Sequence, residues 1–298
     1  MAATRELRLR TGAKLNLFLR VVGRRPDGYH ELESIFQSLD FGDDLQVAEA
    51  PDDEITVAMH SEVVVGLPSQ EQNLAYIAAR RLQEATSTRR GARVQIDKRI
   101  PLGGGLGGGS SNAAGVLLAL DQLWKLGLER RRMLELAAEI GSDVPYCLGG
   151  GATCLVTGRG EKLAPLPPPP RPLWFVLGMS DEPLATATVY AGLGELTEHR
   201  PAVAPVTMAL GAGDVAELGE LLHNDLEPVA LRLRPELRER KDALRAAGAV
   251  GVALSGSGPT LFGLAGDEAG AHAIAERVLG AFDRVVVTSS SSGCVGSA

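Results

Sequence analysis

Residues 7–22 alternate between apolar and polar side chains with the period of two that is typical of a β-strand. One face of this predicted strand carries Ala13, Leu15, Leu17, Leu19 and Val21, and the other carries Lys14, Asn16, Phe18 and Arg20. The pattern predicts a strand that is buried on its apolar side and presents polar groups on the opposite side.

Similar patterns predict the remaining elements. In the first half we expect strands at 45–50, 55–60, 93–100 and around 152–157, and helices at 73–86, 111–126 and 129–140. In the second half we expect strands at 173–178, 250–254, 260–264 and 283–288, a helix at 267–281 and several helices between 187 and 247.

A proline-rich run separates these two sets of elements. Residues 163–173, LAPLPPPPRPL, suit neither a helix nor a central strand, because proline lacks the backbone N–H group. Since 298 residues exceed one typical domain, we expect two domains, at 1–164 and 165–288, with a cleft between them. The segment 289–298 offers little to pack and is expected to be disordered.

Composition narrows the classes of function. Aromatic residues make up 4% of the chain and the net charge is −7, so we expect neither nucleic acid nor an anionic membrane as a partner. The three cysteines, Cys147, Cys154 and Cys294, lack the number and spacing of a disulfide framework or a zinc site. The N-terminus lacks the apolar core of a signal peptide, and no apolar run reaches the ~18–20 residues of a membrane span. We therefore expect a cytoplasmic protein.

The stretch IPLGGGLGGGSSNAAG, 100–115, bares the backbone immediately before a predicted helix. A strand, a glycine loop and a helix start form the layout in which backbone N–H groups and the helix dipole bind phosphate. The predicted phosphate loop consists of Gly103, Gly104, Gly105, Gly107, Gly108 and Gly109, followed by the hydroxyls of Ser110 and Ser111. A tightly turning loop without a ligand is the alternative explanation of the glycines.

Two common phosphate-binding motifs do not fit this stretch. A Walker A loop requires Gly-Lys-Ser/Thr, whereas Gly109 is followed directly by Ser110. The spacing of Gly103, Gly105 and Gly108 satisfies G-x-G-x-x-G, but residues 116–126 read as helix where a dinucleotide-binding fold needs a strand with an acidic end. A dinucleotide-binding oxidoreductase is therefore the weaker hypothesis.

Three motifs, in order along the chain, resemble those of the GHMP family, which is named for galactokinase, homoserine kinase, mevalonate kinase and phosphomevalonate kinase. PLGGGLGGGSSNAAG resembles the family's P-x-x-x-G-L-G-x-G/S-S-S loop, GAKLNLFLRVVGRRPDGYHEL resembles its N-terminal motif, and LSGSGPTLFGL at 254–264 resembles its C-terminal motif. The resemblance implies a two-domain α+β fold, with a first half like the second domain of ribosomal protein S5 and a ferredoxin-like second half. It also implies an enzyme that uses ATP and Mg²⁺ to phosphorylate an alcohol.

Further segments, among them GSDVPYCLGGGATCLVTGRGEKL, resemble the branch of the family whose acceptor is a sugar alcohol linked to cytidine diphosphate. The resemblance covers most of the chain and thins between 195 and 245. It implies a small-molecule substrate. We expect a monomer or weak homodimer. Another acceptor, such as mevalonate or homoserine, is the nearest alternative, and a ligand-binding module without catalysis is a more distant one.

Lys14 and Asp143 are the expected catalytic pair. Lys14 and Asn16 share one face of the predicted strand, about 7 Å apart, and an ammonium between apolar neighbours calls for a carboxylate partner. The resemblance implies that Asp143 accepts the proton of the substrate hydroxyl. From the residues, we expect Lys14 to keep this carboxylate ionised and to lower the pKa of the attacking hydroxyl, and Asn16 to bond to the substrate. From the residues alone, Lys14 can extend from a half-buried strand into solvent, and Asp143 can cap a helix.

The resemblance also implies binding residues. Tyr29 and His30 are expected to bind the cytosine base, with Thr186 and Tyr190 as the opposite wall of that pocket and Thr188 as an alternative to Thr186. Asn73 and Lys98 are expected near adenine, Ser110 or Ser111 near Mg²⁺ or the β-phosphate, and the loop 255–260 along the site. Two structural alternatives stay open, since Tyr29 can cover an edge of the core and Asn73 can cap a helix.

Overall fold

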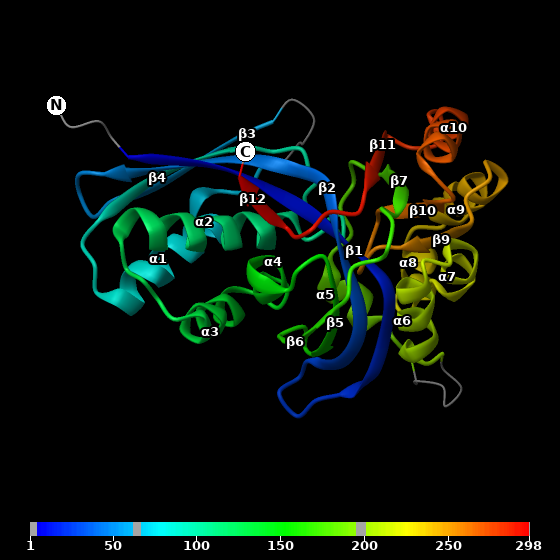
Figure 1. The fold of residues 1–298 in the computed structure, drawn as a ribbon, viewed down its shortest axis with the longest axis horizontal. Coiled ribbons are helices and arrows are strands. Elements are labelled where there is room, and N and C mark those ends of the chain that lie inside the picture. The colour runs from blue at the N-terminus through cyan, green and yellow to red at the C-terminus, as the bar shows by residue number, and fades with distance from the viewer. Residues whose placement is uncertain (1–4, 62–66, 195–200, 298) are drawn as a thin grey trace.

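The computed structural model describes residues 5–61, 67–194 and 201–297 and folds them into two β-sheets with helices packed against them (Figure 1). The first sheet contains β1 (Glu6–Arg24), β2 (His30–Ala50), β3 (Ile55–His60), β4 (Gly91–Asp97), β5 (Thr153–Gly158), β6 (Lys162–Leu166), β8 (His223–Asn224) and β12 (Val295–Ser297). The second contains β7 (Trp174–Met179), β9 (Gly251–Leu254), β10 (Leu261–Ala265) and β11 (Arg284–Ser289).

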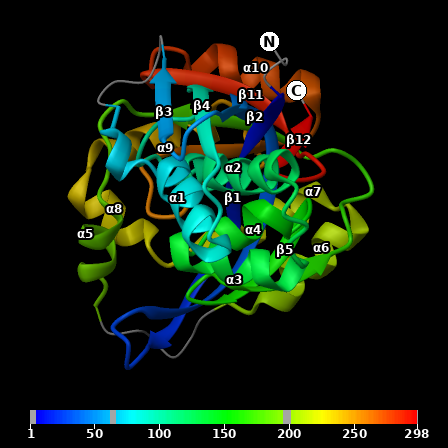
Figure 2. The same ribbon diagram turned by 90° about the vertical axis from the view of Figure 1, so that its left-hand side faces the viewer.

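The helices fall into two groups along the chain. The first group is α1 (Leu74–Thr86), α2 (Gly108–Trp124), α3 (Arg130–Ile140) and α4 (Val144–Gly149), preceded by the 3-10 helix η1 (Gln70–Gln72). The second is α5 (Thr186–Ala191), α6 (Val203–Ala212), α7 (Val215–Leu221), α8 (Glu227–Leu233), α9 (Glu236–Ala246) and α10 (Glu268–Val278). In Figures 1 and 2 the first group gathers beneath the first sheet, and Figure 1 shows α9 and α10 beside the second sheet.

The two sheets have separate strand orders. In the described part of the chain, the first sheet runs β12-β1-β2-β4-β3, with β5 paired to β2 and β6, and β8 paired to β1. The second sheet runs β11-β7-β10-β9. Helix α2 packs across β1 and β2, so the helix that follows the glycine loop rests on the strand that carries Lys14.

The hairpin of β1 and β2 is the longest pairing in the molecule, and its register shifts between Gly12 and Lys14 and between Asn16 and Phe18. Such a bulge turns the following side chain relative to the simple alternation. Phe18, predicted on the polar face, is therefore fully buried and packs in one core with Leu15 and Leu17.

Most predicted elements are present, with their ends shifted by a few residues. Three differences concern the site: α2 begins at Gly108 instead of residue 111, β2 begins at His30 instead of residue 45, and the short helix α4 was not predicted. The predicted proline-rich connection begins with β6, which among the described strands pairs only with β5 and as an edge strand tolerates Pro165.

The C-terminal segment corrects the expectation that residues 289–298 are disordered, up to residue 297, because residue 298 lies outside the described residues. Val295–Ser297 form β12, which pairs with Leu9–Thr11 of β1. Cys294 is buried, and its carbonyl accepts a hydrogen bond from the backbone N–H of Gly12 at 2.5 Å. The segment is ordered because it completes an otherwise unpaired part of β1, and its own composition does not reveal that partner.

The three cysteines are free and buried. Among the helices of the described residues, none combines the length and the apolar character that a membrane crossing requires.

Candidate active site

A cleft of about 1270 Å³ lies between the glycine loop, the β1–β2 hairpin, α5 and the loop 255–260. It brings together the predicted site residues from both halves of the chain, with the exception of Ser111. The lining includes Lys14, Asn16, Tyr29, His30, Asn73, Lys98, Gly103, Gly104, Gly105, Gly107, Gly108, Gly109, Ser110, Asp143, Thr186 and Tyr190.

Lys14 lies at the centre of a set of polar contacts. Its Nζ donates to Asn16 Oδ1 at 2.8 Å and to the Gly105 carbonyl at 3.0 Å, and lies 3.4 Å from Asp143 Oδ2. The Lys14 side chain is 4% exposed and that of Asp143 is 30% exposed, so the ammonium is buried while the carboxylate reaches the cleft. The ammonium also lies 4.8 Å from the centre of the Phe36 ring. These contacts hold a positive charge in place beside a carboxylate that a substrate can approach.

Asp143 occupies the N-cap position of α4, which is the position expected if its role were only to cap a helix. Within the described structure, however, its side chain makes no cap hydrogen bond, and its carboxylate pairs with Lys14 instead. The backbone carbonyl of Asp143 accepts from the N–H of Cys147, which fixes the residue to the helix. The turn at Asp143 therefore aims the side chain at the cleft.

Asn16 is held at both ends of its amide. Its oxygen accepts from Lys14, and its nitrogen donates to Ser34 Oγ at 3.0 Å. Ser34 was not predicted, because a serine within β2 carries no motif of its own. These two hydrogen bonds fix the orientation of the Asn16 amide, with its oxygen toward Lys14.

The glycine loop is shaped by backbone conformations that favour glycine. Gly103, Gly105 and Gly107 have φ values of 62°, 77° and 70°. A Cβ atom at Gly105 would lie 2.0 Å from the Ser255 carbonyl oxygen, so no side chain fits there. Because α2 begins at Gly108, its unpaired first-turn N–H groups lie at the cleft, as a phosphate site requires.

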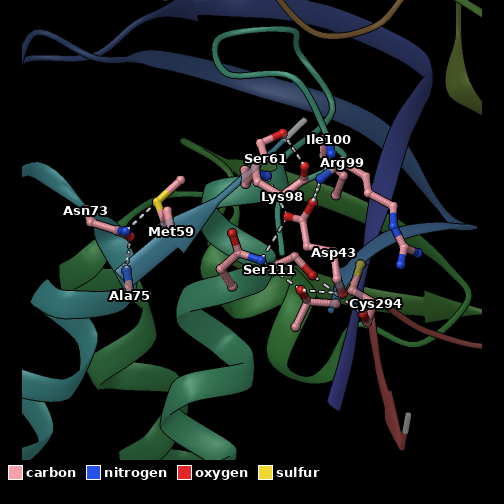
Figure 3. A network of polar contacts seen from close by, with 12 residues as sticks. Asp43, Met59, Ser61, Asn73, Ala75, Lys98, Arg99, Ile100, Ser111 and Cys294 are labelled. Carbon is pink, nitrogen blue, oxygen red and sulfur yellow. Dashed lines mark hydrogen bonds and ion pairs between the residues drawn. The ribbon is translucent and has the colours of Figure 1, made fainter. Parts of the chain in front are cut away.

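The two serines at the start of α2 differ in direction. Ser110 lines the cleft. Ser111 is fully buried, and its hydroxyl donates to the Cys294 carbonyl at 3.5 Å (Figure 3). Successive residues of a helix point about 100° apart, so the two hydroxyls face different surroundings. Ser111 is thus directed away from the expected Mg²⁺ or phosphate, which corrects that part of the prediction.

The loop 255–260 supports the glycine loop from the second half of the chain. Ser255 Oγ donates to the Gly105 carbonyl at 3.0 Å, and the Thr260 N–H donates to the Gly104 carbonyl at 3.4 Å. Asn224 Nδ2 in turn donates to the carbonyls of Leu254 and Gly256 at 2.8 and 2.7 Å. Asn224 was not predicted, because its two-residue strand β8 carries no periodic signal.

The far end of the cleft is aromatic. The rings of His30 and Tyr190 stack with centres 5.1 Å apart, while Tyr29 is 52% exposed and faces the Arg159 guanidinium at 5.4 Å. Burial, and then the charge of Arg24, lower the pKa of His30. Burial, and then the charge of Asp143, raise the pKa of Tyr190. Both rings are therefore favoured in their neutral forms.

Thr186, and not Thr188, lines the cleft at this end, and its hydroxyl lies 2.9 Å from Ser257 Oγ.

Asn73 and Lys98, the residues expected near adenine, are both engaged by the protein (Figure 3). Asn73 caps α1 by accepting from the Ala75 N–H at 2.9 Å, and its nitrogen donates to Met59 Sδ, so the helix-cap alternative is present. The Lys98 side chain is 1% exposed and pairs with Asp43 at 2.5 Å. Burial lowers the pKa of Lys98, and the Asp43 carboxylate opposes this shift.

Within the described residues, no group of three His, Cys, Asp or Glu side chains could hold a metal ion. Two oxygen-bearing groups that line the cleft and suit a metal ion are the Ser110 hydroxyl and the Asp143 carboxylate. Mg²⁺ in nucleotide sites takes most of its ligands from phosphates and water. This sparse set of oxygens fits a metal ion that arrives with the nucleotide.

Comparison with known proteins places this site in a family. Residues 73–151 match the model of the GHMP kinases N terminal domain, and residues 208–284 match that of the GHMP kinases C terminal. The chain is 44% identical over 278 residues to a 4-diphosphocytidyl-2-C-methyl-D-erythritol kinase from Shouchella clausii, covering 93% of this chain and 92% of the relative. It is 41% identical over 273 residues to the protein of the same name from Gloeobacter violaceus, covering 90% and 88%.

Solved structures give the same result for the fold. A crystal structure of 4-(cytidine 5'-diphospho)-2C-methyl-D-erythritol kinase is similar with a TM-score of 0.80 and 36% identity, covering 96% of this chain and 100% of that chain. Homoserine kinase from Cytophaga hutchinsonii shares the fold with a TM-score of 0.77 and 20% identity, covering 99% and 98%. The predicted α+β fold is confirmed, and the dinucleotide-binding oxidoreductase hypothesis is wrong. The chain belongs to the GHMP kinase family.

Proposed function

We propose that this ATP-dependent kinase phosphorylates the 2-hydroxyl of 4-diphosphocytidyl-2-C-methyl-D-erythritol, a step of non-mevalonate isoprenoid precursor synthesis. The relatives of that name, 38–44% identical over most of the chain, support the choice of acceptor. The observation that carries the chemistry is the pair of Lys14 Nζ and Asp143 Oδ2, 3.4 Å apart beside the glycine loop.

In the proposed reaction the acceptor hydroxyl oxygen attacks the γ-phosphorus of ATP, the bond to the β-γ bridging oxygen breaks, and ADP leaves. Asp143 accepts the hydroxyl proton or orients the hydroxyl for attack. Lys14 stabilises the carboxylate and the negative charge that grows on the attacking oxygen. Asn16, fixed by Lys14 and Ser34, positions the acceptor.

The glycine loop is the proposed cradle for the ATP phosphates. The N–H groups at the start of α2 and the Ser110 hydroxyl bind the β- and γ-phosphates. Mg²⁺ neutralises phosphate charge when it is bound with ATP, and Ser110 is the side chain proposed beside it. Adenine is proposed to bind near Asn73 and Lys98, at the side of the cleft where Met59 and Leu74 add apolar surface.

The aromatic end of the cleft is proposed to bind cytosine. The exposed Tyr29 ring offers a face for stacking, and the His30–Tyr190 stack and Thr186 form the rest of the pocket. A domain division at 1–164 and 165–288, a cytoplasmic location and a monomeric or weakly dimeric state complete the proposal.

An ATP-consumption assay with four acceptors tests the proposed substrate. We expect turnover with 4-diphosphocytidyl-2-C-methyl-D-erythritol and little with mevalonate, homoserine or galactose. Ready phosphorylation of mevalonate or homoserine, without competition by CDP, would leave the kinase family in place and refute this acceptor.

A further inference from the structure

Asp43, in β2, is a fully buried carboxylate that the proposed reaction does not use. Its Oδ1 accepts from the backbone N–H groups of Arg99 and Ile100 at 2.7 and 2.8 Å. Its Oδ2 accepts from Lys98 Nζ at 2.5 Å and from Asn112 Nδ2 at 2.9 Å. Figure 3 shows Asp43 at the centre of these contacts. One carboxylate thus satisfies four donors.

These donors belong to the two ends of the glycine loop. Residues 98–100 lead from β4 into the loop, and Asn112 lies near the start of α2, where the loop ends. Asn112 also donates to Thr11 Oγ1 of β1 at 2.7 Å, which ties this end of the loop to the strand of Lys14. The spacing between the two ends of the loop is therefore fixed by a side chain outside it.

The Lys98–Asp43 pair also lies directly beneath the start of α2. A Cβ atom at Gly108 would lie 2.8 Å from Lys98 Nζ, so the ammonium fills the space that the glycine leaves. A neutral amide at position 43 would leave this buried charge unpaired and would turn an N–H₂ group toward the donors of Lys98 and Asn112. The loop ends would lose their common anchor.

We propose that Asp43 is a positioning residue for ATP, whose carboxylate holds the two ends of the glycine loop at the spacing that the phosphates require. A loop that is already ordered loses less entropy when the nucleotide binds, so affinity for ATP depends on this anchor. The assignment rests on the proposed function only in that the loop binds ATP, and it does not depend on the identity of the acceptor.

The test compares Asp43→Asn with Asp44→Asn. Asp44 is the next residue in β2, and its carboxylate pairs with Arg99 at the surface, so this control removes a neighbouring charge without touching the anchor. Equilibrium binding of ATP with Mg²⁺ and of CDP is measured for each folded variant, together with its melting temperature. We expect Asp43→Asn to weaken ATP binding about tenfold or more, as for lost hydrogen bonds to a charged group, and to leave CDP binding within about twofold. Asp44→Asn should leave both affinities unchanged.

A rise in the Kd for ATP of less than about threefold would overturn the proposal, because the loss of hydrogen bonds to a charged group should cost more. An equal loss of ATP and CDP binding would also overturn it, because a general structural defect affects the binding of both ligands. Should Asp43→Asn fail to fold, Asn112→Ala decides by the same threshold, since it removes one loop end and leaves the contacts of Asp43 with Lys98, Arg99 and Ile100. If the native protein binds ATP but not CDP, the proposed acceptor fails, while the ATP measurements and the melting temperature still decide the role of Asp43.

Discussion

The two ends of the cleft differ in how firmly the protein holds them. At the catalytic end, Lys14 is buried among three oxygen-bearing partners, and the glycine loop is bonded to the loop 255–260. At the aromatic end, Tyr29 is 52% exposed, and the rings of Tyr29, His30 and Tyr190 are held largely by ring contacts.

This difference matches what each end has to do. Phosphoryl transfer is accelerated by charges and dipoles that are fixed before the reaction begins. A flat base, in contrast, needs an open slot with exposed ring faces. We therefore expect substitutions at the catalytic end to lower turnover and substitutions at the aromatic end to weaken acceptor binding.

The largest effect is expected for Asp143→Asn, which keeps the shape of the side chain and removes its charge. Turnover should fall by roughly 10²–10⁴, the range of a positioned acid–base group, while ATP affinity stays close to native. Steady-state kinetics and ATP binding check this, with Lys14→Met expected to behave similarly. Near-native turnover of Asp143→Asn would remove Asp143 from the catalytic role.

Lys162 provides the matched control for Lys14. It is exposed on the edge strand β6, so Lys162→Met should leave turnover unchanged. Lys241 is less suitable, because it is paired with Glu227, whose other oxygen accepts from the Leu254 N–H near the loop 255–260. Equal losses in Lys14→Met and Lys162→Met would show that charge in general, and not the pair with Asp143, controls the rate.

At the catalytic end, the sequence predicted the residues that a local pattern or motif carries and missed the residue that supports the glycine loop from a distance. The alternation along residues 7–22 placed Lys14 and Asn16 on one face, and their side chains do meet. The anchor Asp43 was not predictable, since its partners Lys98 and Asn112 lie 55 and 69 residues away and a single aspartate in a strand does not identify them.

Ser111 and the C-terminal strand show two other limits of sequence patterns. Because α2 begins at Gly108, three residues earlier than predicted, both Ser110 and Ser111 lie inside its first turns. Which of the two hydroxyls faces the cleft depends on how the helix packs against the sheet, so the choice required the structure. The pairing of β12 with β1 joins the two ends of the described chain, and no local propensity encodes such a distant contact.

The next largest effect is expected at the aromatic end, for Tyr29→Ala combined with His30→Ala. Binding of CDP and of the cytidylyl acceptor should weaken by roughly 10- to 10³-fold, from ~1–3 kcal/mol of base stacking and ~0.5–1.5 kcal/mol of a hydrogen bond. Affinity for ATP should scarcely change, because the glycine loop lies at the other end of the cleft. CDP competition against the acceptor measures the loss.

His272→Ala is the control for this double variant, because His272 is exposed on α10 in the other group of helices. It should leave CDP binding native. A double variant that loses ATP and CDP binding together would indicate a collapsed hairpin instead of a lost base pocket.

A smaller effect is expected for Gly107→Val in the glycine loop. Gly107 has φ 70°, and a Cβ there would lie 3.0 Å from Lys14 Cγ, so the substitution strains the backbone and presses on Lys14. At ~1–3 kcal/mol for such strain, ATP affinity should fall roughly 5- to 100-fold and the melting temperature should drop as well.

Gly109→Ala is the control for Gly107→Val, because it adds a side chain to the glycine loop without straining the backbone. Gly109 is helical, and its Cβ would lie 3.4 Å from Leu74 Cδ1, so the melting temperature should stay near native. Unchanged ATP affinity in a folded Gly107→Val protein would contradict the assignment of this loop as the phosphate cradle.

The smallest effect concerns pH and tests whether the His30–Tyr190 stack needs a neutral imidazole. Burial, and then Arg24, lower the pKa of His30 below the ordinary value of about 6.5, so His30 is neutral in the folded and unfolded chain at about pH 8. As the pH falls through about 6.5, the unfolded chain takes up the proton first, so the folded protein loses stability, and the ring in the cleft becomes charged only at lower pH.

Once His30 in the folded protein is protonated, we expect the affinity for CDP to be roughly two- to tenfold lower than at about pH 8, corresponding to the ~0.5–1.5 kcal/mol of an aromatic contact. His30→Phe keeps a ring that cannot titrate, and because titration of the ligand affects both proteins equally, the ratio of their affinities isolates His30. If the ratio of the CDP affinities of the native protein and His30→Phe does not change with pH, His30 is not the titrating group. The aromatic end would then differ from the catalytic end only in how its side chains pack, and not in the charge of His30.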